Sequence, residues 1–393
     1  MIFKTLLGIN MIYAQETAPM LGIFNSMAFV LGCCIGSFMN VVVWRLPRGE
    51  SLSHPPSHCP KCGHAIRPWE NIPIISWLCL RARCSSCHLP ISVKYPIGEA
   101  ATGLLFTAIW YSVYLRNLPL DIIPAYFFLG GALLAVALID AEHWFIPNEV
   151  TYSGIVFAVA MAIILPDGRL HAQQSSLIYS GLCNIITQMG FQISAYPLVG
   201  AILDAVLGGA MGFALLTAFS AALRPLFGHS VRLFSKTETL LLSKQGISIG
   251  DKQTSWDELL DRPEDMCILH GNLIEDGKAK GVSSLKANSD GFEIDGQRGS
   301  WQEHKQLKFK AARMATPSDV IGRGDVKLLA MCGAFLGADA TIYILLTASV
   351  IAVAYALLHS CLKGRLITRL PFGPFIAVAG MAWMLFGNFV RFI

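Results

Sequence analysis

The chain has 393 residues, of which 54% are hydrophobic and only 14% are charged. Its mean hydropathy is +0.53. Soluble proteins carry about 25% charged residues, so this composition excludes an ordinary soluble protein and indicates a membrane protein. The net charge of +4 is small and gives no sign of a nucleic-acid partner.

The first apolar run long enough to cross a bilayer, which takes about 20 residues, extends from Leu21 to Trp44. Before it, Met1–Ala14 is expected to be an uncleaved segment, because Gly8 and Asn10 interrupt its apolar core. Seven later runs bring the predicted spans to about eight, at 97–115, 121–141, 149–166, 197–223, 326–338, 341–362 and 372–392.

These spans predict an α-helical polytopic membrane protein with two small cytoplasmic modules. Five regions are expected: an N-terminal segment with the first span (1–44), a tetracysteine domain (45–96), spans two to five (97–223), an inserted domain (224–320) and spans six to eight (321–393).

Basic residues set the expected orientation, because they favour the cytoplasmic side. The loop 45–96 carries seven Lys or Arg residues, and the loop with Lys363, Arg365 and Arg369 carries three. With eight spans, these basic loops lie in the cytoplasm and both termini lie outside. Asp140 then ends the third span and Asp325 begins the sixth at the same depth.

Four cysteines form two Cys-x-x-Cys pairs, Cys59 with Cys62 and Cys84 with Cys87. This spacing supplies four thiolates for a tetrahedral zinc ion, and a site closed by four sulfurs is structural. The alternative is a set of reduced cytoplasmic thiols that bind no metal.

Asp140 lies in Leu138-Ile-Asp140, and Asp325 lies in Gly322-Arg-Gly324-Asp325-Val-Lys327. Carboxylates beside lipid are costly and often functional. Two that lie close together cannot both ionise easily, so a pair can catalyse acid–base hydrolysis. The alternative is structural: Asp325 is suited to cap a helix, and Asp140 marks a helix end.

Other polar residues near the inner boundary are candidates for substrate contact or support. Asn40 and Arg45 lie at the end of the first span, where they could contact a substrate or lipid headgroups. The alternative is that this segment serves only helix packing, for which the nearby Gly36 and Ser37 are small enough. Glu99 lies just inside the second span on the cytoplasmic side.

The segment 224–320 holds 14 of the 26 acidic and 14 of the 30 basic residues, so it is expected to be a soluble insertion. Weak alternation in 267–272 and 282–294 predicts a small β-rich module, with Asp-Gly turns at 276–277, 290–291 and 295–296. Trp256–Asp261 is expected to form a helical turn.

These motifs together resemble the prepilin leader peptidases, the polytopic aspartic peptidases of type IV pilus and type II secretion systems. The resemblance covers nearly the whole chain except the insert. It rests on segments 36–47, 59–87 with Glu70-Asn71-Ile-Pro, 94–99, 138–147, 322–329 and 371–375. The Gly-x-Gly-Asp element alone is less specific, because presenilin-like and preflagellin peptidases are similar there.

The resemblance implies that Asp140 and Asp325 form the catalytic pair, and that Gly322, Gly324 and Lys327 support it. It implies cleavage of prepilins and pseudopilins after a glycine, on the cytoplasmic side of the bacterial inner membrane. It also implies N-methylation of the new N-terminus with S-adenosylmethionine, with Glu70, Asn71 and the zinc domain as neighbours of that activity.

Two departures from the family pattern stand out. Asn148 replaces a frequent aspartate, and an insert of about 95 residues precedes Gly322. The insert either docks a pilus or secretion assembly protein, gates access, or is a tolerated surface insertion. An inactive membrane scaffold with a zinc module is the alternative function. A transporter would show inverted repeats and broken midplane helices, and the sequence shows neither.

Overall fold

The computed structural model describes residues 11–167, 169, 176–189, 196–227, 229–250, 252–260, 265–275, 278–302, 304, 306–317, 320–364 and 370–390. Residues 1–10 of the expected N-terminal segment, the turn at 276–277 and the basic residues Arg365 and Arg369 lie outside these ranges. The chain divides into two compact units, one formed by 1–215 with 324–393 and the other by 216–323.

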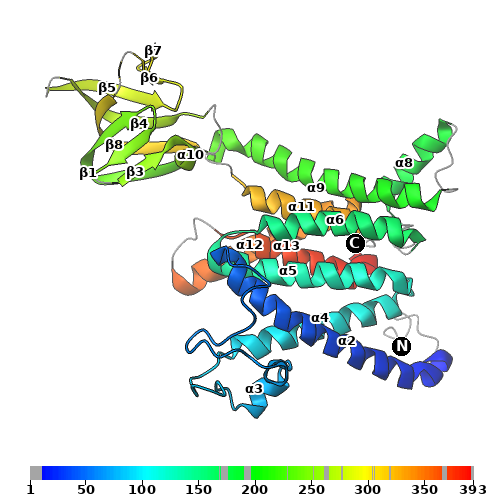
Figure 1. The fold of residues 1–393 in the computed structure, drawn as a ribbon. Helices are drawn as coiled ribbons and strands as arrows, with labels where there is room; N and C mark the ends of the chain where they lie inside the picture. The colour runs from blue at the N-terminus through cyan, green and yellow to red at the C-terminus, as the bar shows by residue number, and fades with distance from the viewer. Residues whose placement is uncertain are drawn as a thin grey trace. The chain divides into compact units, whose positions relative to one another are not determined.

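The first unit is helical (Figure 1). Eight helices of the chain match the predicted apolar runs: α2 (Met11–Arg45), α4 (Lys94–Leu115), α5 (Ile123–His143), α6 (Asn148–Ile164), α9 (Pro197–Phe227), α11 (Arg323–Leu336), α12 (Ala338–Lys363) and α13 (Gly373–Val390). The part of α9 from Leu216 onward, and Arg323 of α11, are counted in the second unit. A further helix, α8 (Leu177–Gln188), was not predicted. It begins at Ser176, whose hydroxyl accepts the Tyr179 N–H.

Four segments are long and apolar enough to cross a membrane: Leu21–Arg48, Leu120–His143, Pro197–Arg224 and Ala338–Lys363. Asn148–Ile164 and Gly373–Gly387 are shorter apolar helices. The helical membrane architecture is thus confirmed in outline, while the number of eight spans stays a prediction.

Helix α5 lies at the centre of this unit and contacts α2, α4, α6 and α13. Leu129, Leu133, Val136 and Ile139 are fully buried along it. This burial explains why its apolar residues do not fall on a single face.

Glycines allow the outer helices to pack closely. A Cβ on Gly32 of α2 would lie 2.7 Å from the backbone of Gly103 in α4, and one on Gly36 would lie 2.8 Å from the Glu99 Cα. Gly208 of α9 and Gly333 of α11 likewise leave no room for a Cβ between their backbones. The expectation that Gly36 serves close packing agrees with this geometry.

The second unit is built on an eight-stranded antiparallel sheet with the order β3-β2-β1-β8-β4-β5-β6-β7. The strands are β1 (His229–Ser243), β2 (Gly246–Ile249), β3 (Lys252–Ser255), β4 (Cys267–Glu275), β5 (Lys278–Ala287), β6 (Phe292–Ile294), β7 (Gln297–Gly299) and β8 (Gln306–Pro317). A short helix, α10 (Trp256–Leu259), lies at the predicted helical turn. A β-rich insert was predicted, and the sheet confirms it.

This unit has a hydrophobic core of its own. Leu240, Leu269, Leu285 and Phe309 are fully buried in it. The predicted turn at Asp295-Gly296 joins β6 to β7, and both residues have positive φ, as a tight hairpin requires.

Candidate active site and cysteine cluster

Asp140 lies one turn before the end of α5, and its side chain is buried. Its backbone carbonyl accepts the N–H of Trp144, which closes the helix in a left-handed conformation. Its Oδ2 accepts the backbone N–H of Gly373 at 3.1 Å. Among the described residues, no basic side chain forms an ion pair with this carboxylate.

Ile146 connects Asp140 to the Gly-x-Gly-Asp motif. A Cβ on Gly373 would lie 2.6 Å from Asp140 Oδ2 and 3.1 Å from Ile146 Cδ1, and a Cβ on Gly324 would lie 2.9 Å from Ile146 Cβ. One isoleucine therefore contacts both glycines, so the structure brings Asp140 and the residue before Asp325 to one place.

Asp325 lies in the first turn of α11, which begins at Arg323. The residue is therefore inside the helix and does not precede it as an N-cap would. Gly322 is exposed just before the helix, and every residue from Leu328 to Leu336 is buried. The buried helix fixes the half-buried Asp325 in its first turn, next to the exposed Gly322 and Arg323.

Two further contacts show that these helix termini share one end of the unit. Lys327 Nζ donates to Asn148 Oδ1 at 2.7 Å, joining the beginnings of α11 and α6. Lys94 Nζ pairs with Glu142 Oε1 at 2.7 Å, joining the beginning of α4 to the end of α5. Because the side chain of Asn148 is neutral, this contact is a hydrogen bond and not an ion pair.

The other support candidates organise the loop that follows α2. The buried Arg45 donates to the carbonyls of Ser51 at 2.9 Å and Pro55 at 2.8 Å. Asn40 Nδ2 donates to the Tyr95 carbonyl at 3.1 Å. These residues hold the loop between α2 and α4 in place, and the described contacts do not bring them to Asp140.

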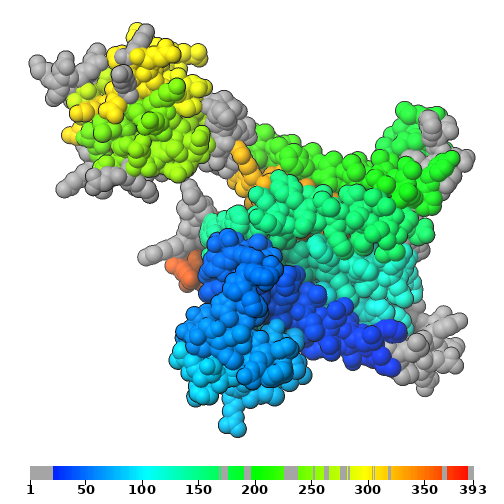
Figure 2. All heavy atoms as spheres, viewed as in Figure 1, coloured from blue at the N-terminus to red at the C-terminus, as the bar shows by residue number. Residues whose placement is uncertain are grey.

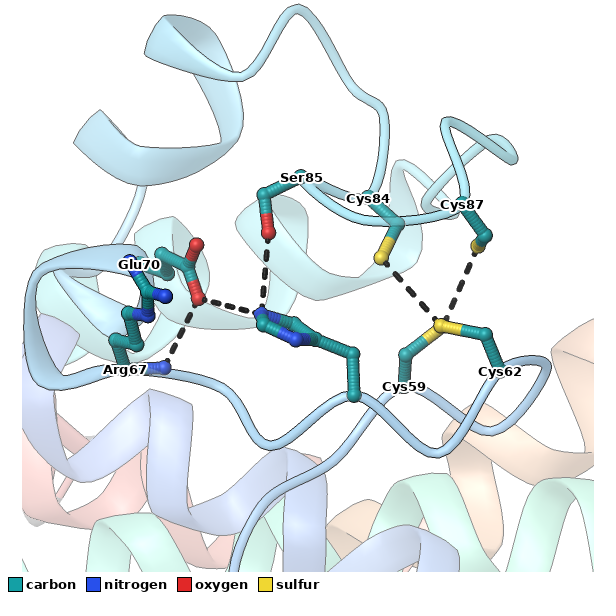
Figure 3. Close-up of polar contacts among 8 residues, drawn as sticks. Cys59, Cys62, Arg67, Glu70, Cys84, Ser85 and Cys87 are labelled. Carbon is teal, nitrogen blue, oxygen red and sulfur yellow. Dashed lines mark hydrogen bonds and ion pairs between the residues drawn. The ribbon is translucent and has the colours of Figure 1, made fainter.

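The four cysteine thiols face one another (Figure 3). Cys59 Sγ lies 4.0 Å from Cys87 Sγ, and Cys62 Sγ lies 3.9 Å from Cys84 Sγ. Four sulfurs around zinc, with Zn–S bonds of about 2.3 Å, would lie about 3.8 Å apart. All four sulfurs lie within 4.8 Å of one another, so the cluster fits a tetrahedral metal ion.

Backbone N–H groups around Cys59 and Cys84 favour thiolates, whereas burial and the neighbouring thiols raise the pKa of Cys87 to about 11. The Lys61 N–H lowers the pKa of the Cys59 thiol to about 7, and the Cys87 and Ser86 N–H groups lower the pKa of the Cys84 thiol. Metal ligands must be deprotonated, so lower pKa values assist binding.

Glu70 belongs to the same module, in the 3₁₀ turn η2 (Pro68–Asn71). Its Oε2 accepts the Arg67 N–H at 3.0 Å and lies 3.2 Å from His64 Nε2 (Figure 3). The Arg67 N–H, the Ser85 hydroxyl and His64 lower the pKa of Glu70 to about 2. Its carboxylate is therefore engaged within the module, while Asn71 is exposed.

The opposite end of the helices holds a second polar site. Arg169 Nη2 lies 2.7 Å from Asp204 Oδ2, and both residues are buried. Arg169 also donates to the Phe335 carbonyl at 3.2 Å. A cavity lined in part by Asp121, Tyr126 and Arg169 lies there. Since Asp121 precedes α5 and Asp140 nearly ends it, this cavity is remote from Asp140.

The sequence did not predict that two further residues, Gly373 and Ile146, contact the aspartate site. Gly373 donates to Asp140, and Ile146 packs against both glycines. Both lie in segments that carried the family resemblance, 371–375 and 138–147. A glycine between two prolines, at Pro371 and Pro374, was the signal for a close backbone approach.

Comparison with known proteins shows which family this chain resembles. Residues 30–113 match the bacterial peptidase A24 N-terminal domain, and residues 309–357 match the type IV leader peptidase family. A prepilin leader peptidase/N-methyltransferase of Burkholderia pseudomallei is 27% identical over 93% of this chain and 87% of its own length.

These matches show that the chain is similar to the prepilin leader peptidases. A family member from Myxococcus xanthus, with the same description, is 45% identical over 36% of this chain, but the match spans only 42% of that relative. One from Neisseria gonorrhoeae is 34% identical over 33% of this chain and 54% of its own length. The matches confirm the predicted family and its enzyme class. No solved structure matches this chain.

Proposed function

We propose that the protein is a membrane aspartic endopeptidase with Asp140 and Asp325 as its catalytic pair. It removes the basic leader from type IV prepilins and pilin-like secretion proteins on the cytoplasmic side of the bacterial inner membrane. The supporting observation is the buried Asp140, which has no basic partner among the described residues and lies beside Ile146 and the Gly324-Asp325 step.

The pair works with one carboxylate ionised and one protonated. The ionised group takes a proton from water, and the water oxygen attacks the scissile carbonyl carbon. The protonated group donates to the carbonyl oxygen. When the C–N bond breaks, the leaving amine takes up a proton from the pair. Gly373 supports this chemistry because its N–H orients the Asp140 carboxylate.

The location of the site suits such a substrate. A pilin precursor has a basic leader followed by an apolar helix in the membrane, and a shallow site at the helix ends reaches the junction between them. Membrane anchoring of both molecules raises the local concentration of the substrate.

The cysteine cluster is proposed to hold a structural zinc ion through Cys59, Cys62, Cys84 and Cys87. Four thiolates leave no open position for a substrate, so the metal stabilises the module. A chelator that removes zinc should release one ion per chain and expose the module to proteolysis. A chain purified with intact activity and no bound metal would contradict this assignment.

A second activity, N-methylation of the new N-terminus with S-adenosylmethionine, is proposed from the descriptions of the relatives. The Glu70 carboxylate is engaged with His64 and Arg67, and the cavity beside Arg169 lies at the opposite end from Asp140. Neither the Glu70 carboxylate nor this cavity is therefore assigned a role in methyl transfer. A cleaved product heavier by one methylene, only when the methyl donor is supplied, would establish the activity.

The alternative function is an inactive membrane scaffold with a zinc module. It accounts for the cysteine cluster, but it assigns no role to a buried carboxylate without a basic partner. The insert 224–320, whose sheet has a hydrophobic core of its own, is proposed to dock a pilus or secretion assembly protein or to gate access. A tolerated surface insertion is the alternative.

The test is cleavage of a pilin precursor in membranes by wild type, Asp140→Asn and Asp325→Asn. General acid–base groups contribute about 10²–10⁴-fold to rate, so each variant should lose cleavage by at least about 10²-fold. Glu142→Gln is the matched control, because Glu142 lies at the same helix end but pairs with the exposed Lys94.

Three outcomes decide between the hypotheses. Loss in both aspartate variants with retention in Glu142→Gln supports the peptidase. Full cleavage by either aspartate variant overturns the paired mechanism. A correctly folded wild type that cleaves no pilin precursor favours the scaffold.

A further inference from the structure

The cysteine module exposes a row of large apolar side chains, which we call the apolar ridge: Trp69, Ile72, Ile75 and Leu78. Their exposed fractions are 63%, 44%, 57% and 61%. Trp69 lies in η2, Ile72 directly follows it, and Ile75 and Leu78 lie in the short helix α3 (Ile75–Cys79). Within α3, side chains three apart lie on one side of the helix, which applies to Ile75 and Leu78. Exposed apolar surface of this kind marks a site of interaction.

The ridge lies beside the membrane helices and not beyond their ends. The Ile74 N–H, in the middle of the ridge, donates to Glu99 Oε2 at 2.7 Å. Glu99 is the sixth residue of α4, which places it about 7–8 Å along the helix axis at 1.5 Å per residue. Figure 1 shows α3 alongside this first part of α4.

Neighbouring surface on α4 is also apolar at this level. Ile97, two residues before Glu99, is 59% exposed. On the other side, Glu99 contacts Gly36 in α2, a helix with a segment long and apolar enough to span a membrane. Figure 2 shows the module, coloured blue to cyan, at the surface of the molecule, and no other segment covers it in this view.

Charge around the ridge suits anionic headgroups. Residues 51–93 contain the basic residues Lys61, Arg67, Arg81 and Arg83 but only one acid, Glu70. Glu70 is engaged by the Arg67 N–H and His64. The Arg67 guanidinium lies 5.6 Å from the centre of the Trp69 ring. Basic and aromatic residues together are typical of a membrane interface.

We propose that the apolar ridge inserts into the interface of an anionic lipid bilayer. The cysteine module is then a domain that lies on the membrane surface. The Glu99–Ile74 hydrogen bond sets the depth of the module relative to α4. The partner is lipid, because the ridge is continuous in depth with membrane helices and its surroundings are basic. The inference rests on the membrane location of the helices and is independent of the peptidase activity.

The test uses the full chain in vesicles of phosphatidylethanolamine and phosphatidylglycerol, without substrate. A genetically encoded spin-label residue replaces Ile75 or Leu78, and a control label replaces the exposed Lys61 on the first cysteine pair. Power-saturation spectra report access of oxygen, which concentrates in lipid, and of a water-soluble nickel chelate. Zinc content of each variant verifies that the module is folded.

Labels at Ile75 and Leu78 should show high access to oxygen and a severalfold lower access to nickel than the label at Lys61. Equal access to nickel at all three positions would place the ridge in water and overturn the proposal. Low access to both reagents would show that protein covers the ridge, which also overturns it.

A second measurement uses unlabelled chains. In the Ile75→Ser, Leu78→Ser double variant, the module should detach from lipid, and trypsin should cut at Arg81 or Arg83 severalfold faster in vesicles. Leu89→Ser is the matched control, since Leu89 is 43% exposed but lies outside the ridge. Equal cutting rates in the double variant and wild type, at equal zinc content, would contradict insertion.

Discussion

Asp140 and Asp204 are both buried carboxylates in helices of the membrane unit, yet their surroundings differ. Asp204 lies 2.7 Å from the buried guanidinium of Arg169, whereas Asp140 accepts only the backbone N–H of Gly373 among the contacts described. A carboxylate beside a buried arginine has an opposite charge as its partner. One held by a neutral N–H group can exchange a proton, so burial alone does not identify a catalytic acid.

The two carboxylates also differ in the helices that they connect. Arg169 joins Asp204 of α9 to the end of α11 at Phe335. Asp140 meets the beginning of α13, at Gly373, where a Cβ would touch the carboxylate. The Arg169–Asp204 pair links two helices by an ion pair and a hydrogen bond. Around Asp140, the backbone of Gly373 packs closely against the carboxylate.

The largest expected effect is on stability, at the paired site. Arg169→Met would leave the Asp204 charge buried without a partner, which costs about 3–5 kcal/mol. Thermal unfolding in detergent should show a marked loss for this variant, while the cleavage rate per folded molecule stays near that of wild type.

The double variant Arg169→Met, Asp204→Leu sharpens this result. Replacing a buried ion pair by apolar residues is often neutral, so the double variant should recover most of the stability. If Arg169→Met alone unfolds at the wild-type temperature, the Arg169–Asp204 pair does not stabilise the fold, and the structural role given to Asp204 is wrong.

A smaller effect is expected on catalysis, at Gly373. The Cβ of Gly373→Ala would lie 2.6 Å from Asp140 Oδ2 and would displace the carboxylate. A misplacement of about 1 Å can cost about 10²-fold in rate, or about 2.7 kcal/mol. Initial rates of pilin-precursor cleavage measure this loss.

Gly22→Ala is the matched control for that experiment. Gly22 also lies in a membrane helix, but a Cβ there would meet no atom within 4 Å. An undiminished rate in Gly373→Ala would show that Asp140 does not need this enclosure.

The smallest effect is expected at the exposed pair of Lys94 and Glu142. Although Glu142 is only two residues from Asp140, its ion pair with Lys94 is exposed to solvent. Such pairs contribute about 0–1 kcal/mol, so Lys94→Met should change neither the unfolding temperature nor the cleavage rate measurably. A large loss of cleavage would mean that the charges at this helix end act on the aspartates together.

The helices could be predicted from sequence because each consists of a long apolar run. The segment 372–392 matched α13 at Gly373–Val390, and 149–166 matched α6 at Asn148–Ile164. Helix α8 was missed because Leu177–Gln188 is short and contains polar residues. Its N-terminal N–H groups are accepted by Asp339, 162 and 161 residues away, which no local pattern indicates.

The sequence singled out Asp140 and Asp325, whose catalytic role stays a prediction, but it did not predict the contacts around them. Asp140 and Asp325 stood out because carboxylates beside apolar runs are costly. The donor Gly373 lies 233 residues from Asp140, and the pairing of Arg169 with Asp204 crosses 35 residues. Such pairings depend on how the helices pack. The sequence also left Asp325 open to a capping role, whereas the residue lies within the first turn of α11.

The most direct test of the account compares cleavage of a pilin precursor by Asp140→Asn and Asp204→Asn, each expressed per folded molecule. The account predicts that Asp140→Asn folds normally and loses at least about 10²-fold in rate, while Asp204→Asn is less stable but cleaves normally when folded. A folded Asp140→Asn variant that cleaves at the wild-type rate would contradict the assignment of Asp140 as a catalytic residue.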